Sequence, residues 1–168
     1  MKSILFLTLF LCIVPGSIAG DFTLYFTRHF EKQTGTNPAL TQQGVEKAQA
    51  FASLLEHAGI KKVYSTNYRR TQQSAAPIAL KVNTAVTFYD PRDLTKLAAK
   101  LLSEQQNAVV VGHSNTTPDI IGLVGGEANP ISETEFGDVY MLRYSTQSQS
   151  GEPLGKPVLV NTVHVKLQ

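Results

Sequence analysis

The chain has 168 residues, of which 42% are hydrophobic, and a formal net charge of +2. This length predicts one domain with a sizeable core, and the composition is that of a folded protein rather than a disordered one. The small net charge argues against nucleic acid as a partner and against an anionic membrane surface.

The first residues have the pattern of a secretory signal peptide. A lysine follows the initial methionine, an apolar run extends from Ile4 to Val14, and small residues lead up to Ala19. We therefore expect a leader at 1–19, a single domain at 20–168, and export to a periplasm or to the medium. The apolar run is too short to span a bilayer comfortably, so no stable membrane insertion is expected after cleavage. An uncleaved membrane anchor is the alternative.

Cysteine chemistry is excluded from the mature chain if the leader is removed. Cys12 is the single cysteine of the sequence, and it lies within the leader. The mature domain would then have no disulfide, no thiolate metal site and no cysteine nucleophile.

Strand and helix signals alternate along most of the chain. This alternation predicts an α/β, three-layer sandwich, with a mostly parallel central sheet and helices on both faces. The expected strands lie at 22–27, 62–65, 85–89 and 108–111, with two more at 139–144 and 157–165 that extend the sheet, at least one of them antiparallel. The expected helices lie at 41–58, 67–79, 94–102 and 117–123.

Two residues are expected to shape these helices. Thr41 is predicted to be the N-cap of the first helix, because its side chain can accept a hydrogen bond from an unpaired backbone N–H. Pro77 is expected to kink the second helix or to end its regular part, because proline has no N–H to donate.

Polar residues of similar chemistry follow three of the expected strands. These residues are Arg28-His29, then Ser65 with Arg69-Arg70 shortly after it, and Gly112-His113-Ser114. Ligands bind at the carboxyl ends of the strands in an open parallel sheet, so these side chains are expected to converge there. Each set alone is equally compatible with a solvated turn or helix surface, and it is their joint placement that indicates an anion or phosphate site.

His29 is the candidate nucleophile of this site. A neutral imidazole can attack phosphorus and form a covalent phosphohistidine. The transferring phosphoryl group needs fixed positive donors, which Arg28 and Arg70 would supply. His113 is placed to donate to another oxygen. Further donors are expected from Ser65 and Asn115.

Four segments of the chain carry motifs in a characteristic order. They are Thr27–Lys32, Leu40–Gly44, Ser65–Ala75 and Val111–Asn115. In that order they resemble the Arg-His-Gly/Ala-Glu, Leu-Thr-x-x-Gly, Ser-Ser-x-x-x-Arg-Ala-x-Gln-Thr-Ala and Gly-His motifs of the histidine phosphatase superfamily, in its phosphoglycerate mutase-like branch. The resemblance implies a phosphoglycerate mutase-like fold and a phosphatase that needs no metal or organic cofactor.

The resemblance also implies a role for each matching residue. His29 would be phosphorylated, Arg28 and Arg70 would hold the phosphoryl oxygens, and His113 would complete the pocket. The motif aligns its arginine with Arg70, which leaves Arg69 as a neighbour on the helix surface.

The residue that would protonate the leaving oxygen can be sought only by its position in the sequence. Many members of this branch use a glutamate between the arginine and the second histidine, and here the first candidate is Asp90, with Asp93 second. Asp90 also precedes Pro91, a position typical of a helix N-cap.

The residue after the nucleophile departs from the motif. The superfamily has a small residue there and this chain has Phe30. The ring either narrows the pocket or packs into the core.

These observations predict an exported phosphatase that hydrolyses phosphomonoesters through phosphorylated His29, with Asp90 protonating the leaving oxygen. The substrate would be a small phosphorylated molecule or a phosphoprotein, and no oligomeric state is predicted. A phosphohistidine protein phosphatase is one alternative, and a non-catalytic phosphate- or anion-binding envelope protein on the same fold is another. The short chain has no lid-like insertion, which disfavours a mutase. Arginines beside the histidines disfavour a metal site.

Overall fold

The computed structural model describes residues 20–147, 150–151 and 153–167, so the predicted leader lies outside the described residues. The strands are β1 (Phe22–Arg28), β2 (Lys62–Ser65), β3 (Val86–Phe88), β4 (Ala108–Gly112), β5 (Asp138–Gln147) and β6 (Pro153–Lys166). The helices are α1 (Gln42–Leu54), α2 (Arg69–Lys81), α3 (Leu94–Glu104) and α4 (Thr116–Leu123). Within these ranges, none of the helices has the length and apolar character needed to cross a membrane.

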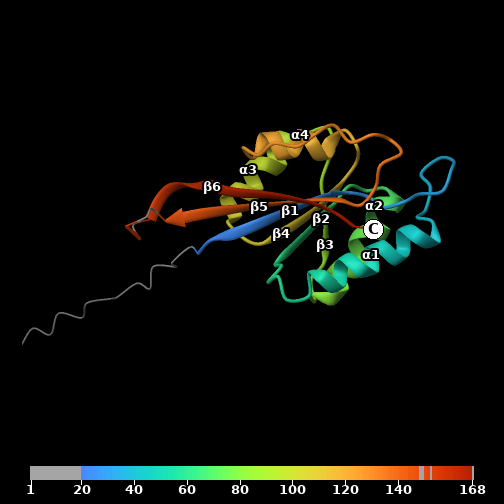
Figure 1. The fold of residues 1–168 in the computed structure, drawn as a ribbon, viewed down its shortest axis with the longest axis horizontal. Coiled ribbons are helices and arrows are strands. Elements are labelled where there is room, and N and C mark those ends of the chain that lie inside the picture. Colours follow the sequence, from blue (N-terminus) through green and yellow to red (C-terminus); the bar gives the residue numbers. More distant parts are fainter. Residues whose placement is uncertain (1–19, 148–149, 152, 168) are drawn as a thin grey trace, which may run out of the picture.

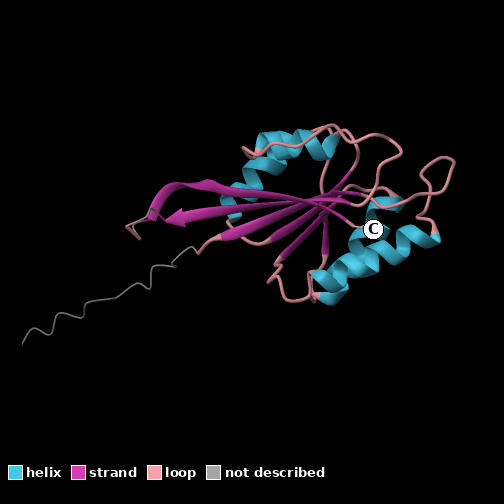
Figure 2. Ribbon diagram, viewed as in Figure 1, coloured by secondary structure: helices cyan, strands magenta, loops and turns pink. Residues whose placement is uncertain are grey.

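The strands form one six-stranded sheet in the order β3-β2-β4-β1-β5-β6. Strands β1 to β4 are parallel, β5 runs antiparallel to β1, and β6 runs antiparallel to β5 (Figures 1 and 2). The expected mostly parallel sheet and antiparallel tail are confirmed. In the register, Arg28 lies beside Gly112 and Ser65 lies beside Val111. The carboxyl ends of β1, β2 and β4 therefore meet at one edge of the sheet.

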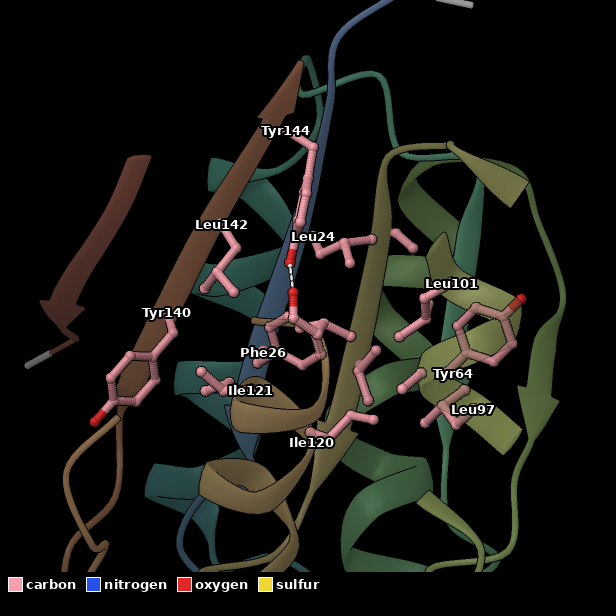
Figure 3. Close-up of a cluster of buried hydrophobic side chains, with 14 of the residues drawn as sticks. Leu24, Phe26, Tyr64, Leu97, Leu101, Ile120, Ile121, Tyr140, Leu142 and Tyr144 are labelled. Atoms are coloured by element: carbon pink, nitrogen blue, oxygen red, sulfur yellow. Dashed lines mark hydrogen bonds between the residues drawn. The ribbon is translucent and has the colours of Figure 1, made fainter. Parts of the chain in front are cut away.

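Helices cover both faces of the sheet, as the alternating pattern predicts (Figure 1). Helices α1 and α2 pack on one face and α3 and α4 on the other, so the sheet separates two hydrophobic cores. The central strand β4 is buried along its whole length, as its run of valines between Ala108 and Gly112 requires. Figure 3 shows the core under α3 and α4, where the Tyr144 hydroxyl donates to the Val124 carbonyl at 2.8 Å.

Two helix expectations need correction. Helix α2 continues through Pro77 to Lys81, because buried Ala75 and Ile78 hold the helix to the sheet on both sides of the proline. Proline removes only its own hydrogen bond, and the Val82 N–H still donates to the Ile78 carbonyl at 3.1 Å. The first helix ends at Leu54 rather than near residue 58, and turns follow it.

Candidate active site

A cavity of about 350 Å³ lies at the carboxyl ends of β1 and β4. Five of the predicted site residues line it: Arg28, His29, Arg70, His113 and Asn115. Its remaining charged side chains are those of Lys32, Arg92 and Glu133. Four permanent cations against one carboxylate make the cavity a place for an anion.

His29 directly follows β1, and its backbone is tied to the neighbouring strand. Its N–H donates to the Gly112 carbonyl at 3.0 Å, and its Nδ1 lies 2.7 Å from the Phe30 carbonyl. A carbonyl only accepts, so Nδ1 carries the hydrogen and Nε2 keeps its lone pair. Burial lowers the pKa of His29 to about 3, and the charges of Arg28 and Arg70 add to this shift. The ring is therefore neutral at pH 7, with Nε2 available as a nucleophile.

The Leu-Thr-x-x-Gly segment holds the chain that follows His29. The Thr41 N–H donates to the Glu31 carbonyl at 2.8 Å, and Thr41 caps α1 by accepting from the Gly44 N–H at 3.1 Å. A Cβ on Gly44 would lie 2.2 Å from the Glu31 carbonyl oxygen, so only glycine fits there. The motif thus fixes the start of α1 against the nucleophile segment.

Phe30 packs into the core and does not narrow the cavity. Its side chain is fully buried and meets the Phe51 ring edge to face, with 6.1 Å between the centroids. The Phe30 N–H is held by α2, since it donates to the Ser74 hydroxyl at 3.1 Å. The bulky residue therefore anchors the nucleophile segment from behind.

The second histidine lies against the first. The rings of His29 and His113 are 5.7 Å apart between centroids and meet edge to face. Arg70 donates to Nδ1 of His113 at 3.3 Å, so Nε2 must carry the hydrogen, and Nε2 lies 2.9 Å from the Thr66 hydroxyl. Burial is the main cause that lowers the pKa of His113 to about 4, and the positive charges of Arg70 and Arg28 lower it further. Both of its nitrogens are thus engaged, and donation to a phosphoryl oxygen would require one of these bonds to open.

Arg28 makes contacts that the sequence did not indicate. Its Nη1 donates to the carbonyls of Ser132 and Glu135, each at 2.7 Å. Its Nη2 donates to the Glu133 carbonyl at 3.0 Å and to the Glu133 carboxylate at 3.1 Å. These four contacts account for all but one of the five N–H donors of a guanidinium. Arg28 therefore fixes the loop before β5, and only its Nε–H is left for a ligand.

The two arginines share an unusual feature. Nε of Arg28 and Nε of Arg70 are both buried and have no hydrogen-bond partner among the described residues. Unpartnered buried donors are rare in proteins, and here both belong to cations that line the same cavity. The two guanidinium charges would attract an anionic ligand into the cavity.

Glu133 and Arg92 are charged residues of the site that sequence reasoning missed, and Glu133 is the acidic one. It lies in the loop between α4 and β5, and its carboxylate accepts a hydrogen bond from Ser114, the residue after His113. That bond, and then the charges of Arg28, Lys32 and Arg70, lower the pKa of Glu133. The loop has no periodic pattern, so neither Glu133 nor its contact with Arg28, 105 residues away, has a local signal in the sequence.

The structure does not bring three other candidates to the cavity. Ser65 is fully buried and its hydroxyl donates to the Thr66 carbonyl at 2.9 Å. Arg69 is exposed on α2, as the resemblance implied. Asp93 caps α3 by accepting from the Lys96 N–H at 3.1 Å.

Asp90 does not line the cavity either, although its neighbour Pro91 and its partner Arg92 do. Its two carboxylate oxygens accept from the Arg92 guanidinium at 2.9 and 2.8 Å. Hydrogen bonds from Arg92 lower the pKa of Asp90 to about 2, so the group is a carboxylate at neutral pH. Asp90 therefore forms a surface ion pair with Arg92 and is not among the residues that line the cavity. Asp90 is not the N-cap of α3 either, since Asp93 holds that position.

Across the residues that the structure describes, no three or more His, Cys, Asp or Glu side chains gather in a way that could hold a metal ion. The cavity instead combines two neutral imidazoles with arginines. Such a set suits an anionic group rather than a cation.

The first half of the domain matches a known family. Residues 24–92 match the family model described as Histidine phosphatase superfamily (branch 1). This range includes Arg28, His29 and Arg70, three of the residues that line the cavity. No curated protein matches the sequence.

Solved structures share the fold. The protein histidine phosphatase SixA, complexed with tungstate, has a TM-score of 0.59 at 15% identity, over 83% of this chain and 95% of that one. The putative phosphohistidine phosphatase SixA from Nakamurella multipartitia has a TM-score of 0.58 at 20% identity, over 86% and 96%. Phosphoserine phosphatase from Entamoeba histolytica, in complex with 3-phosphoglyceric acid, has a TM-score of 0.55 at 17% identity, over 84% and 96%.

The α/β fold with its site at the strand ends is thus the histidine phosphatase fold. Residues 24–92 match branch 1 of the histidine phosphatase superfamily, and solved histidine phosphatases share the fold of the whole domain.

Proposed function

We propose that this protein is an exported phosphatase that hydrolyses phosphomonoesters through a phosphohistidine intermediate on His29. One observation carries the proposal: Nδ1 of His29 donates to the Phe30 carbonyl at 2.7 Å, in a ring that burial keeps neutral. This bond leaves the lone pair of Nε2 as the nucleophile. Export rests on the leader-like sequence at 1–19.

The arginines support the same reaction. In the first step Nε2 of His29 bonds to phosphorus as the bond to the leaving oxygen breaks, and negative charge gathers on the equatorial oxygens. Arg28 and Arg70 both line the cavity, so their guanidinium charges would stabilise those oxygens. In the second step water displaces His29 from phosphorus and inorganic phosphate is released.

The test is to capture the intermediate. Mature protein is mixed with para-nitrophenyl phosphate labelled in its phosphoryl group, quenched in alkaline denaturant, and digested for mass spectrometry. Label on His29 is expected, and none on a His29→Asn variant. Phosphate binding without turnover and without label would instead identify the non-catalytic anion-binding alternative.

A phosphohistidine protein phosphatase is the second candidate. The position of Asp90 favours it, because the acid expected to protonate an alkoxide pairs with Arg92 and does not line the cavity. The imidazole that leaves from a phosphohistidine substrate needs such an acid less than the alkoxide of an alkyl phosphate does. Turnover of a phosphohistidine peptide without turnover of any alkyl phosphate would select this candidate.

A further inference from the structure

The loop between α4 and β5 presents a carboxylate to the cavity from an unexpected part of the chain. Among the described side chains that line the cavity, Glu133 is the single carboxylate. It lies beyond His113 in the sequence, whereas the resemblance looks for the acid between Arg70 and His113. Asp90, from that expected segment, does not line the cavity.

Glu133 accepts hydrogen bonds from two residues that are next to the histidines in the chain. One oxygen accepts from Nη2 of Arg28, the residue before His29, at 3.1 Å. The other oxygen accepts from the hydroxyl of Ser114, the residue after His113. Two donors therefore orient the carboxylate, and each belongs to a residue that is next to one of the two histidines in the sequence.

The backbone of the loop is fixed as well. The carbonyls of Ser132, Glu133 and Glu135 all accept from the buried Arg28 guanidinium, and Arg28 also lies over the Phe136 ring at 4.2 Å. A buried arginine that fastens the loop carrying the carboxylate makes Glu133 a positioned group rather than a chance surface charge.

We propose that Glu133 is the acid–base residue of the reaction, which passes a proton to the leaving oxygen in the first step and takes one from water in the second. This inference rests on the proposed function. It assigns a group from outside the expected segment to the role first considered for Asp90.

The proposed cycle balances in protons and bonds. In the first step Nε2 of His29 bonds to phosphorus, the ester P–O bond breaks, and the proton of Glu133 moves to the leaving oxygen to release the alcohol. In the second step a water oxygen bonds to phosphorus, its proton moves to Glu133, and the N–P bond breaks to restore the lone pair of His29. The net reaction consumes one water and releases inorganic phosphate.

The surroundings of Glu133 suit both steps. The hydrogen bond from Ser114, and after it the nearby cations, lower the pKa of Glu133 and keep it a carboxylate in the free protein, ready to accept a proton. A bound phosphoryl group adds negative charge beside it, which opposes that shift and favours the protonated form. The side chain is 76% exposed, so it can also exchange protons with solvent.

The experiment compares two esters that differ in their need for an acid. The nitrophenolate of para-nitrophenyl phosphate leaves without a proton, whereas the alkoxide of glycerol 1-phosphate requires one. In Glu133→Gln, kcat/KM for glycerol 1-phosphate is expected to fall by about 10²–10⁴-fold, and kcat/KM for the aryl ester by less than about tenfold. Slower dephosphorylation should lower kcat and KM together for the aryl ester and produce a burst of nitrophenolate.

The matched control is Glu135→Gln. Glu135 lies in the same loop but does not line the cavity, and glutamine keeps an acceptor for the Ser132 N–H that its carboxylate now bonds at 3.1 Å. This variant is expected to leave the ratio of the two kcat/KM values unchanged. The retained aryl phosphatase activity of Glu133→Gln serves as its own check on folding.

The outcomes separate this inference from the proposed function. If the wild-type protein hydrolyses both esters through His29, and Glu133→Gln slows both equally or neither, then Glu133 only fastens the loop and the inference is overturned. An alkyl-selective loss in Asp90→Asn but not in Glu133→Gln would overturn it as well. Failure of the wild-type protein to hydrolyse either ester would instead refute the proposed function.

Discussion

Two cavities of the molecule are lined by histidine, and they differ in what surrounds the imidazole. In the cavity at the strand ends, His29 is buried among arginines and bonded to a carbonyl. The second cavity, of about 590 Å³, lies between α4 and the outer strands, where Nε2 of His164 is 2.8 Å from the Asp138 carboxylate. That cavity is lined by Glu127 and by no described arginine or lysine.

The contrast shows why residue type alone does not identify a phosphatase site. His164 lies on β6 at the outer edge of the sheet, 41% exposed and stacked on the Tyr140 ring at 4.3 Å. A phosphate dianion there would meet carboxylates, whereas beside His29 it would meet guanidinium donors. Surrounding charge and burial, rather than the imidazole, distinguish the two cavities.

The largest expected effect is on turnover. His29→Ala is expected to lower kcat/KM for para-nitrophenyl phosphate by roughly four orders of magnitude or more, because it removes the nucleophile. His164→Ala removes the same side chain from the other cavity and should leave the rate unchanged. Steady-state kinetics on both purified variants measures this. Activity that survives the first change, or disappears with the second, would reverse the assignment of the two cavities.

The pH dependence of stability should report on the buried histidines of the cavity at the strand ends. An unfolded chain protonates its imidazoles near pH 6.5, but folded His29 and His113 resist protonation until about pH 3 and about pH 4. The unfolded state therefore binds more protons between those values, so the free energy of unfolding falls as pH is lowered from about 6.5. Each unit of pKa difference corresponds to about 1.4 kcal/mol, which makes the loss several kcal/mol.

Urea unfolding between pH 5 and 6.5 measures this slope above the range in which most carboxyl groups titrate. His29→Asn should have a shallower slope than the wild-type protein. An unchanged slope in His29→Asn would mean that His29 is not held neutral by burial.

Much of the site could be predicted because its signals are local. The run of valines in β4 marks a central buried strand, and in a parallel sheet the residues that follow such strands must share one edge. The order of residues along the chain is therefore enough to predict that His29, Arg70 and His113 lie together, and all three line the cavity. The resemblance then supplies roles for the same residues.

The remaining contacts depend on partners that have no local signal. Asp90 follows a strand, as a catalytic acid would, but Arg92 two residues later occupies both of its oxygens. Arg28 precedes the nucleophile, yet its guanidinium group donates to carbonyls of residues more than 100 positions later in the sequence. Glu133 becomes part of the site only because that loop folds back. The roles of Asp90, Arg28 and Glu133 therefore depend on contacts that form only in the folded structure.

The smallest expected effect compares two helical glycines, Gly44 behind the segment that follows His29 and Gly122 at the second cavity. Gly44 of α1 supports the segment after His29, and an added Cβ would lie 2.2 Å from the Glu31 carbonyl oxygen. Gly122 of α4 lines the second cavity, and a Cβ there would meet nothing within 4 Å. Gly44→Ala is expected to destabilise the protein by about 1–3 kcal/mol, because two backbone segments must move apart.

Gly122→Ala should instead stabilise the protein by about 0.5–1 kcal/mol, because alanine loses less backbone entropy in a helix. Chemical denaturation measures both changes, and aryl phosphatase kinetics shows where they act. Since Glu31 is two residues from His29, only Gly44→Ala should also lower turnover. Equal stabilisation by both substitutions would contradict the close packing of α1 against the nucleophile segment, and with it the distinction between a tightly supported cavity and an open one.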